Sequence, residues 1–223
     1  LFIFASLGSA DELRNAVDSK DRSEKNIVRD EFRKPYETLS FFQLEPDMTI
    51  VELSPGGGWY TEILANFIRK SGNLIAAHFS KDSDRAYFRN SRINFEKKVK
   101  ENSLYEKVRV VDLNSKLSDP SSVDAVLTFR NLHNWIGPQM DKIFKNSYKA
   151  LKPGGIFGIV EHRANPGTSL DVMKKSGYVT ESYAIAIAEK HGFVLVDKSE
   201  INANPKDLTN YEKGVWTLPP SLR

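Results

Sequence analysis

One stretch decides the fold of this chain: Ile50-Val51-Glu52-Leu53-Ser54-Pro55-Gly56-Gly57-Gly58-Trp59-Tyr60-Thr61. It begins as a short apolar run, breaks at Pro-Gly-Gly-Gly, and continues as a helical pattern to Ile68. This order predicts a strand, a tight glycine loop and a helix N-terminus. Glycine allows positive φ and close approach of a ligand to the main chain, and free N–H groups at a helix start attract negative charge. We therefore expect the loop to bind a small polar metabolite; the alternative is that it only turns the chain.

The composition is that of an ordinary soluble globular domain. The chain has 223 residues, of which 40% are hydrophobic and 27% are charged. Its net charge of +3 is too small to indicate nucleic-acid binding, and no run approaches the roughly 18 apolar residues of a membrane span. Cysteine is absent and the four histidines lack metal-ligand spacing, so we expect neither disulfides nor a metal site.

The first ten residues resemble the end of a secretory signal peptide. An apolar run from Leu1 to Leu7 is followed by the small residues Gly8-Ser9-Ala10 and then by acidic residues. We expect an exported, periplasmic or secreted protein. The alternative is a cytoplasmic protein whose N-terminal arm packs on the core. The remaining chain divides into N-terminal helices (11–44), a main domain (45–202) and a C-terminal tail (203–223).

Within the main domain, apolar strands alternate with helices. The patterns predict strands near 48–53, 74–79, 108–111, 123–129, 156–160 and 193–196, separated by helices near 59–70, 82–101, 138–151 and 179–190. Apolar rather than alternating strands imply an α/β fold, a doubly wound and mostly parallel sheet with helices on both faces. Ligands bind beyond the carboxyl ends of such strands. We therefore expect five stretches to converge there: residues 52–58, 78–80, 112–114, 130–135 and 161–163.

A seventh strand is not expected. After the predicted sixth strand, residues 214–218 are the one run of about five β-forming residues that turn residues do not interrupt, and paired prolines follow this run directly. Proline removes a ladder donor, so this run would make at most a short edge strand. We expect either the tail or a second copy of the chain, forming a homo-oligomer, to cover the exposed sheet edge.

The glycine loop only partly matches the GxGxxG pattern of dinucleotide-binding proteins. It more closely resembles class I S-adenosylmethionine-dependent methyltransferases, whose acid and GxGxG motif correspond to Glu52-x-Ser54-x-Gly56-x-Gly58. Similar to the family's later motifs are Asp112, residues 129–135 (Phe-Arg-Asn-Leu-His-Asn-Trp) and residues 150–155 (Ala-Leu-Lys-Pro-Gly-Gly). The resemblance covers residues 45 to 200. This chain departs from the family at His78, where an acid usually grips the ribose, and in the absent seventh strand.

The resemblance implies a Rossmann-like fold with S-adenosylmethionine as cofactor. It assigns the cofactor site to Glu52, Ser54, Pro55, Gly56, Gly57, Gly58, Tyr60, His78, Asp112 and Arg130. His133 and His162, which titrate near neutrality, are the candidate catalytic bases, although a structural role is as plausible for each. Aromatic residues that would contact substrate are Tyr36, Trp135 and Tyr178, with the core as the alternative location.

The sequence thus predicts methylation of a small molecule rather than of nucleic acid, because no basic stripe with interleaved aromatics accompanies the site. Two other functions remain open. One is an exported binding protein that keeps the fold without catalysis, and the other is a nicotinamide-dependent oxidoreductase.

Overall fold

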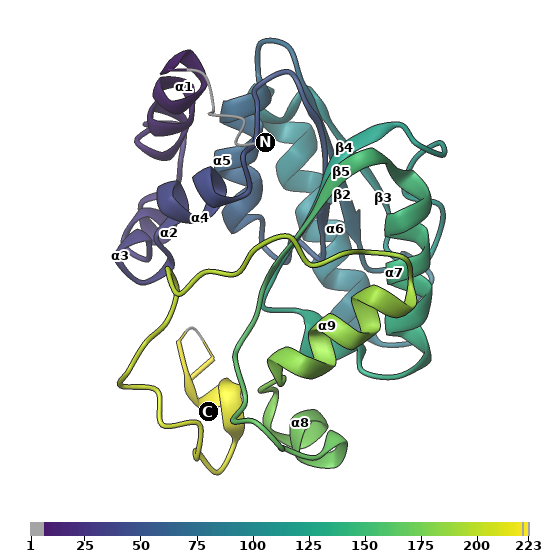
Figure 1. Ribbon diagram of the computed structural model, residues 1–223. Helices are drawn as coiled ribbons and strands as arrows, with labels where there is room; N and C mark the ends of the chain where they lie inside the picture. The colour runs from purple at the N-terminus through teal and green to yellow at the C-terminus, as the bar shows by residue number, and fades with distance from the viewer. Residues whose placement is uncertain (1–6, 220, 223) are drawn as a thin grey trace.

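The computed structural model describes residues 7–219, 221 and 222, and it is built around one parallel sheet (Figure 1). Within the described residues, five strands lie in the order β3-β2-β1-β4-β5. All four pairings between neighbours are parallel. The strands are β1 (Thr49–Leu53), β2 (Asn73–His78), β3 (Val108–Asp112), β4 (Val123–Phe129) and β5 (Leu151–Val160). The predicted doubly wound α/β fold is confirmed.

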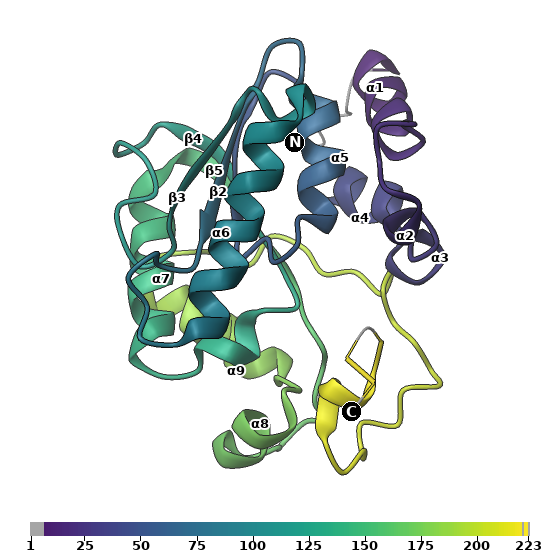
Figure 2. The same ribbon diagram turned by 180° about the vertical axis from the view of Figure 1, so that it is seen from behind.

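Helices cover both faces of this sheet (Figures 1 and 2). The helices α1, α4, α5 and α6 contribute to the apolar cluster on one face, and α7 and α9 pack on the other. The longer helices are α1 (Leu7–Val17), α4 (Pro35–Phe41), α5 (Trp59–Ile68), α6 (Ala86–Glu101), α7 (Pro138–Ala150), α8 (Leu170–Ser176) and α9 (Glu181–Lys190). Shorter turns are α2 (Glu24–Ile27), α3 (Asp30–Arg33), η1 (Ser103–Tyr105), η2 (Leu132–Trp135) and η3 (Gly214–Thr217).

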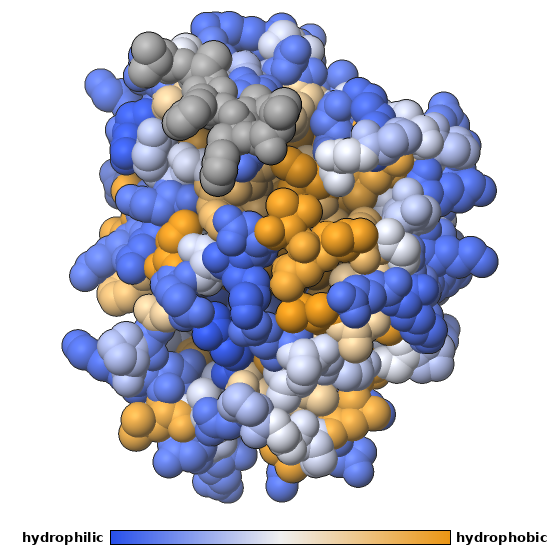
Figure 3. Space-filling view, in the orientation of Figure 1, coloured by the Kyte–Doolittle hydropathy of each residue, from blue (hydrophilic) through white to orange (hydrophobic). Residues whose placement is uncertain are grey.

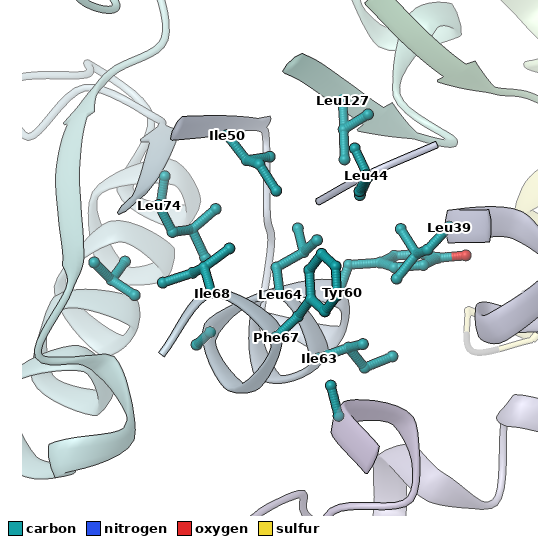
Figure 4. Close-up of a cluster of buried hydrophobic side chains, with 14 of the residues drawn as sticks. Leu39, Leu44, Ile50, Tyr60, Ile63, Leu64, Phe67, Ile68, Leu74 and Leu127 are labelled. Carbon is teal, nitrogen blue, oxygen red and sulfur yellow. The ribbon is translucent and has the colours of Figure 1, made fainter. Parts of the chain in front are cut away.

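The core explains why the central strands are continuously apolar. Ile50 of β1 points into the cluster on the α5 face, whereas its neighbour Val51 points into the cluster on the α7 face, and both are fully buried. Figure 4 shows the first of these clusters, where Ile63 and Leu64 of α5 lie among side chains from the N-terminal helices and the sheet. Burial on both faces fixes the register of β1 and therefore the position of the loop that follows it.

The predicted sixth strand is wrong. Residues 193–196 form no strand, and Val194 and Val196 are 81% and 94% exposed. A strand needs a hydrogen-bonded neighbour, and no described segment after β5 pairs with that edge. The apolar composition alone therefore does not produce one.

The expectation for the tail is confirmed in its main point. No described residue between 205 and 223 belongs to a strand, and Gly214–Thr217 forms the 3₁₀ turn η3 instead of a short edge strand. The segment after α9 crosses in front of β5 (Figure 1). Residues of β5 and of this segment line the same groove. Pairing with a second copy at this edge stays a prediction.

The N-terminal boundary predicted at residue 10 does not coincide with a structural break. Helix α1 begins at Leu7, and Ser9 is buried, with its hydroxyl donating to the Leu44 carbonyl at 3.2 Å. Residues 1–6 of the proposed signal remnant lie outside the described residues. No helix that the structure describes is long and apolar enough to cross a membrane.

Candidate active site

The glycine loop between β1 and α5 has the backbone that its sequence requires. Ser54, Gly56 and Gly58 have φ values of 53°, 59° and 82°, in the left-handed region that favours glycine. A Cβ added at Gly56 or Gly57 would meet no atom within 4 Å, whereas one at Gly58 would lie 3.1 Å from the Phe95 ring. Open space therefore surrounds the first two glycines, and the third packs against α6.

Two side chains fix the loop from the α6 side. His78 Nδ1 accepts from the Phe79 N–H at 2.8 Å, so the neutral ring donates from Nε2 to the Gly56 carbonyl at 3.1 Å. Burial lowers the pKa of His78, which favours this neutral form. Lys98 Nζ donates to the Gly57 carbonyl at 3.1 Å. Both ring nitrogens of His78 are thus engaged, and the structure uses this residue to hold the loop rather than leaving it free for a ribose hydroxyl.

Glu52 lies beneath the loop, where it is only 2% exposed. Its Oε2 accepts from the Thr61 hydroxyl at 2.6 Å. Burial raises the pKa of Glu52 to about 7, against the opposing effects of the Thr61 hydrogen bond and the Lys98 charge. The carboxyl group is therefore partly protonated near neutral pH and can act as donor or acceptor.

The other residues assigned to the cofactor differ in exposure. Pro55 is buried, and the buried Ser54 hydroxyl has no hydrogen-bond partner among the described residues. Asp112, at the end of β3, pairs in register with His78 and accepts from the Asn114 N–H at 2.8 Å. Tyr60 is 2% exposed and stacks on Phe129 at 3.5 Å, so its ring belongs to the core and not to a ligand surface.

A second group of polar residues lies at the ends of β4 and β5. His133 Nδ1 lies 3.0 Å from Glu161 Oε1, and the two side chains are only 6% and 8% exposed. The Glu161 carboxylate also accepts from the backbone N–H groups of His133, at 3.2 Å, and of His162, at 2.7 Å. The rings of His133 and His162 lie 6.1 Å apart. The two histidines proposed from sequence are therefore neighbours.

Two aromatic residues cover this histidine pair. Tyr178 lies edge-on to His162 at 5.9 Å and donates from its hydroxyl to Asp207 Oδ1 at 2.7 Å. Trp216 of η3 lies edge-on to His133 at 5.8 Å. The predicted substrate contact of Tyr178 stays a prediction. Nothing in the sequence indicated Trp216, because a tail without regular pattern does not show where it folds back.

The other two predicted substrate residues have structural positions. Trp135 is 3% exposed and belongs to the apolar cluster on the α7 face, and its contact with substrate stays a prediction. Tyr36 packs against the opposite cluster with the Arg14 guanidinium 3.4 Å from its ring centre. In each case the ring is used for packing, which is the more frequent role of an aromatic residue.

Asn131 connects the glycine loop with the second group. Its side-chain amide lies within hydrogen-bonding distance of the Ser54 carbonyl, at 3.3 Å, and of the Phe129 carbonyl, at 3.1 Å. The preceding residue, Arg130, has φ 61° and donates its backbone N–H to the Val160 carbonyl at 2.7 Å. The ends of β1, β4 and β5 are therefore joined, as the parallel topology predicts.

A groove runs along β5 and opens beside this site. Its lining includes Arg130, Glu161 and His162 from the strand ends, and Asn202 and Asp207 from the tail. Figure 3 shows a hollow near the middle of this face, with strongly hydrophilic residues beside a hydrophobic patch. No group of three or more histidine, aspartate or glutamate side chains in the part of the chain described here is arranged to hold a metal ion.

Comparison with known proteins agrees with this geometry. Residues 51–159, from β1 into β5, match the family described as a methyltransferase domain. The chain carries a class I S-adenosylmethionine-dependent methyltransferase domain. No curated protein is similar enough in sequence to count as a relative of this methyltransferase chain.

Solved structures share the fold at low sequence identity. A SAM-dependent methyltransferase from Aquifex aeolicus has a TM-score of 0.59 and 18% identity over 79% of this chain and 86% of that one. Geranyl diphosphate methyltransferase in complex with SAM has a TM-score of 0.57 and 13% identity, covering 80% and 73% of the two chains. The [4+2]-cyclase SpnF has a TM-score of 0.57 and 16% identity, covering 84% and 71%. The methyltransferase fold thus also supports a cyclase.

The residues of the loop fit the cofactor at one end. The space that a Cβ would fill at Gly56, and the buried Ser54 hydroxyl that has no partner among the described residues, leave room and a polar contact for a ligand. The fit is weaker at the end of β2, because His78 is bonded to the loop and offers no carboxylate to a ribose.

Proposed function

We propose that this protein transfers a methyl group from S-adenosylmethionine to a small-molecule acceptor. The observation that carries the proposal is the open glycine loop, tied by Asn131 to the end of β4, with the His133–Glu161 pair following directly in the chain. The sulfonium supplies an electrophilic methyl group when it is bound, and the acceptor must lose a proton if it is a hydroxyl or an amine. A base beside the strand ends can accept that proton.

His133 is the better base of the two histidines. Its Nδ1 faces Glu161, which fixes the orientation of the ring, so Nε2 is the nitrogen that would take the acceptor proton. Burial lowers the pKa of His162 to about 4, despite the opposing effect of Glu161. His162 is therefore neutral and weakly basic near pH 7, which suits hydrogen bonding to the acceptor.

A small acceptor is favoured over a polymer by the cover of the site. Tyr178 and Trp216 lie against the histidine pair, and the tail borders the groove. The net charge of +3 adds no broad attraction for nucleic acid. These features support a ligand that fits between the strand ends and the tail.

The proposal is tested by incubating the protein with radiolabelled S-adenosylmethionine and fractions of a metabolite extract. Label should move to a small molecule, and His133→Gln should lower the rate by about 100-fold or more while leaving cofactor affinity unchanged. Normal turnover by His133→Gln would remove the residue from the mechanism.

A binding protein without catalysis is the second candidate, favoured by the engagement of His78 where a ribose acid is expected. Thermal-shift assays with S-adenosylmethionine, its demethylated product and NAD separate the possibilities. A shift with the first two and not with NAD supports the methyltransferase. A shift with none of them supports a binder for another ligand.

We also propose that the protein is exported, from the apolar start and the small residues before Asp11. N-terminal sequencing of the protein from its native cell should give a start near Asp11. A mature chain that retains residues 7–10, which form the first turn of α1, would contradict export by this route.

A further inference from the structure

Three arginines from distant parts of the chain line one section of the groove beside the active site. Arg29 precedes α3, Arg33 ends α3, and Arg130 directly follows β4. All three are half-buried. The fold has therefore gathered three positive charges at the end of the sheet where the histidine pair lies.

No carboxylate neutralises this arginine cluster. Among the residues that the structure describes, none of the three arginines forms an ion pair. Asp30, the acid next to Arg29, is committed to Arg22 through two hydrogen bonds of 2.6 and 2.8 Å. Glu161 is likewise committed to His133. Asp30 acts on Arg33 only at longer range, where it raises the Arg33 pKa, and neither acid forms an ion pair with a described arginine of the cluster.

The cluster is electrostatically unfavourable as it stands. Burial first, and then the Arg130 and Arg29 charges, lower the pKa of Arg33 to about 9. Burial and Arg130 also lower the pKa of Arg29. Arg130 and the buried Tyr60 hydroxyl are neighbours that interact with each other, and Arg130 Nη1 has no hydrogen-bond partner among the described residues. Unsatisfied buried donors are costly, so a bound acceptor group would relieve both the repulsion and the desolvation.

Packing holds the arginines in place without a ligand. Arg33 Cζ lies 4.7 Å from the Trp59 ring centre, and Trp59 is itself fixed by donating to the Asn26 carbonyl at 2.9 Å. The Arg130 backbone is tied to Val160. Preorganised guanidinium groups match the planar oxygen pairs of carboxylates and phosphates.

We propose that Arg29, Arg33 and Arg130 bind a carboxylate or phosphate group of the methyl acceptor. This inference rests on the proposed function, because it concerns the substrate of the same site. The three arginines and His162 line the same groove, and the Arg130 charge is one of the causes that lower the pKa of His162. An anionic acceptor held by the arginines would thus lie in the groove that Glu161 and His162 also line.

The test is calorimetric titration of the full chain with inorganic phosphate and pyrophosphate as probes, and separately with S-adenosylhomocysteine, which carries the carboxylate of the methyl donor. Arg33→Gln is the test variant. The control is Arg163→Gln, because Arg163 lines the same groove but is exposed and paired with Glu200 at 2.8 Å. Thermal unfolding checks that both variants are folded.

We expect Arg33→Gln to weaken phosphate binding by about tenfold or more and Arg163→Gln to leave it unchanged, with S-adenosylhomocysteine affinity unaltered in both. Equal phosphate affinity in Arg33→Gln and the unmodified protein would overturn the anion site. An equal loss for phosphate and S-adenosylhomocysteine would assign the cluster to the methyl donor and overturn the acceptor proposal. If the unmodified protein binds phosphate through Arg33 but not S-adenosylhomocysteine, the proposed function fails while the anion site stands.

Discussion

Replacing Glu52 by glutamine should change how the stability of the protein depends on pH. On folding, burial raises the pKa of this carboxyl group from its ordinary 4.5 to about 7. The folded state then holds the proton more tightly than the unfolded state, so stability falls as pH rises between these two values and is constant above them. Ionisation of the buried Glu52 lowers the free energy of unfolding by about 3 kcal/mol in total. Of this loss, roughly 2–3 kcal/mol develops between about pH 5 and pH 8.

Urea denaturation at the two pH values measures this effect. The measured quantity is the free energy of unfolding of Glu52→Gln minus that of the unmodified protein. This difference should be about 2–3 kcal/mol more favourable to the variant at pH 8 than at pH 5, because glutamine accepts the hydrogen bond from Thr61 but does not ionise. Glu37→Gln is the control, since Glu37 is exposed on α4 and should show no such difference. An identical effect of Glu52→Gln at both pH values would refute the buried, proton-binding position of this carboxyl group.

Two further predictions concern packing around the loop and the sheet. Gly58→Ala should lower the free energy of unfolding by about 1–2 kcal/mol, because its φ is 82° and the new Cβ would lie 3.1 Å from Phe95, whereas Gly57→Ala should be nearly neutral. Urea denaturation compares the two, and equal costs would contradict the loop geometry. Phe129→Ala should cost about 3 kcal/mol in thermal or urea unfolding, because its ring stacks at 3.5 Å on the buried tyrosine at the start of α5. A loss below about 1 kcal/mol would show that this stack contributes little.

The sequence alone predicted the strand–loop–helix unit and which strand ends meet beside it, because these signals are local. An apolar strand followed by glycines identifies the loop at residues 54–58, and parallel topology brings the ends of the other strands to it. His133 and His162 were found in the same way, since each closely follows an apolar strand. Periodicity and turn chemistry were sufficient for these features.

Other features depend on contacts that no local pattern encodes. The apolar residues 193–196 predict a strand, but no strand in the described part of the chain pairs with them. The cluster of Arg29, Arg33 and Arg130 is invisible in sequence, because the first two lie in a charged segment that reads as a solvated helix face. The engagement of His78 depends likewise on the Gly56 carbonyl turning toward it.

Calorimetric titration with S-adenosylhomocysteine tests the central claim most directly, namely that the glycine loop binds the cofactor. Gly56→Ala and Gly57→Ala each add a methyl group where no atom of the protein lies within 4 Å, but Gly56 is half-buried and Gly57 is exposed. The account predicts that Gly56→Ala weakens binding by about tenfold or more, because its methyl group occupies the ligand's space, whereas Gly57→Ala binds nearly as the unmodified protein does. Equal affinity of Gly56→Ala and the unmodified protein, or no binding by the unmodified protein, would contradict it.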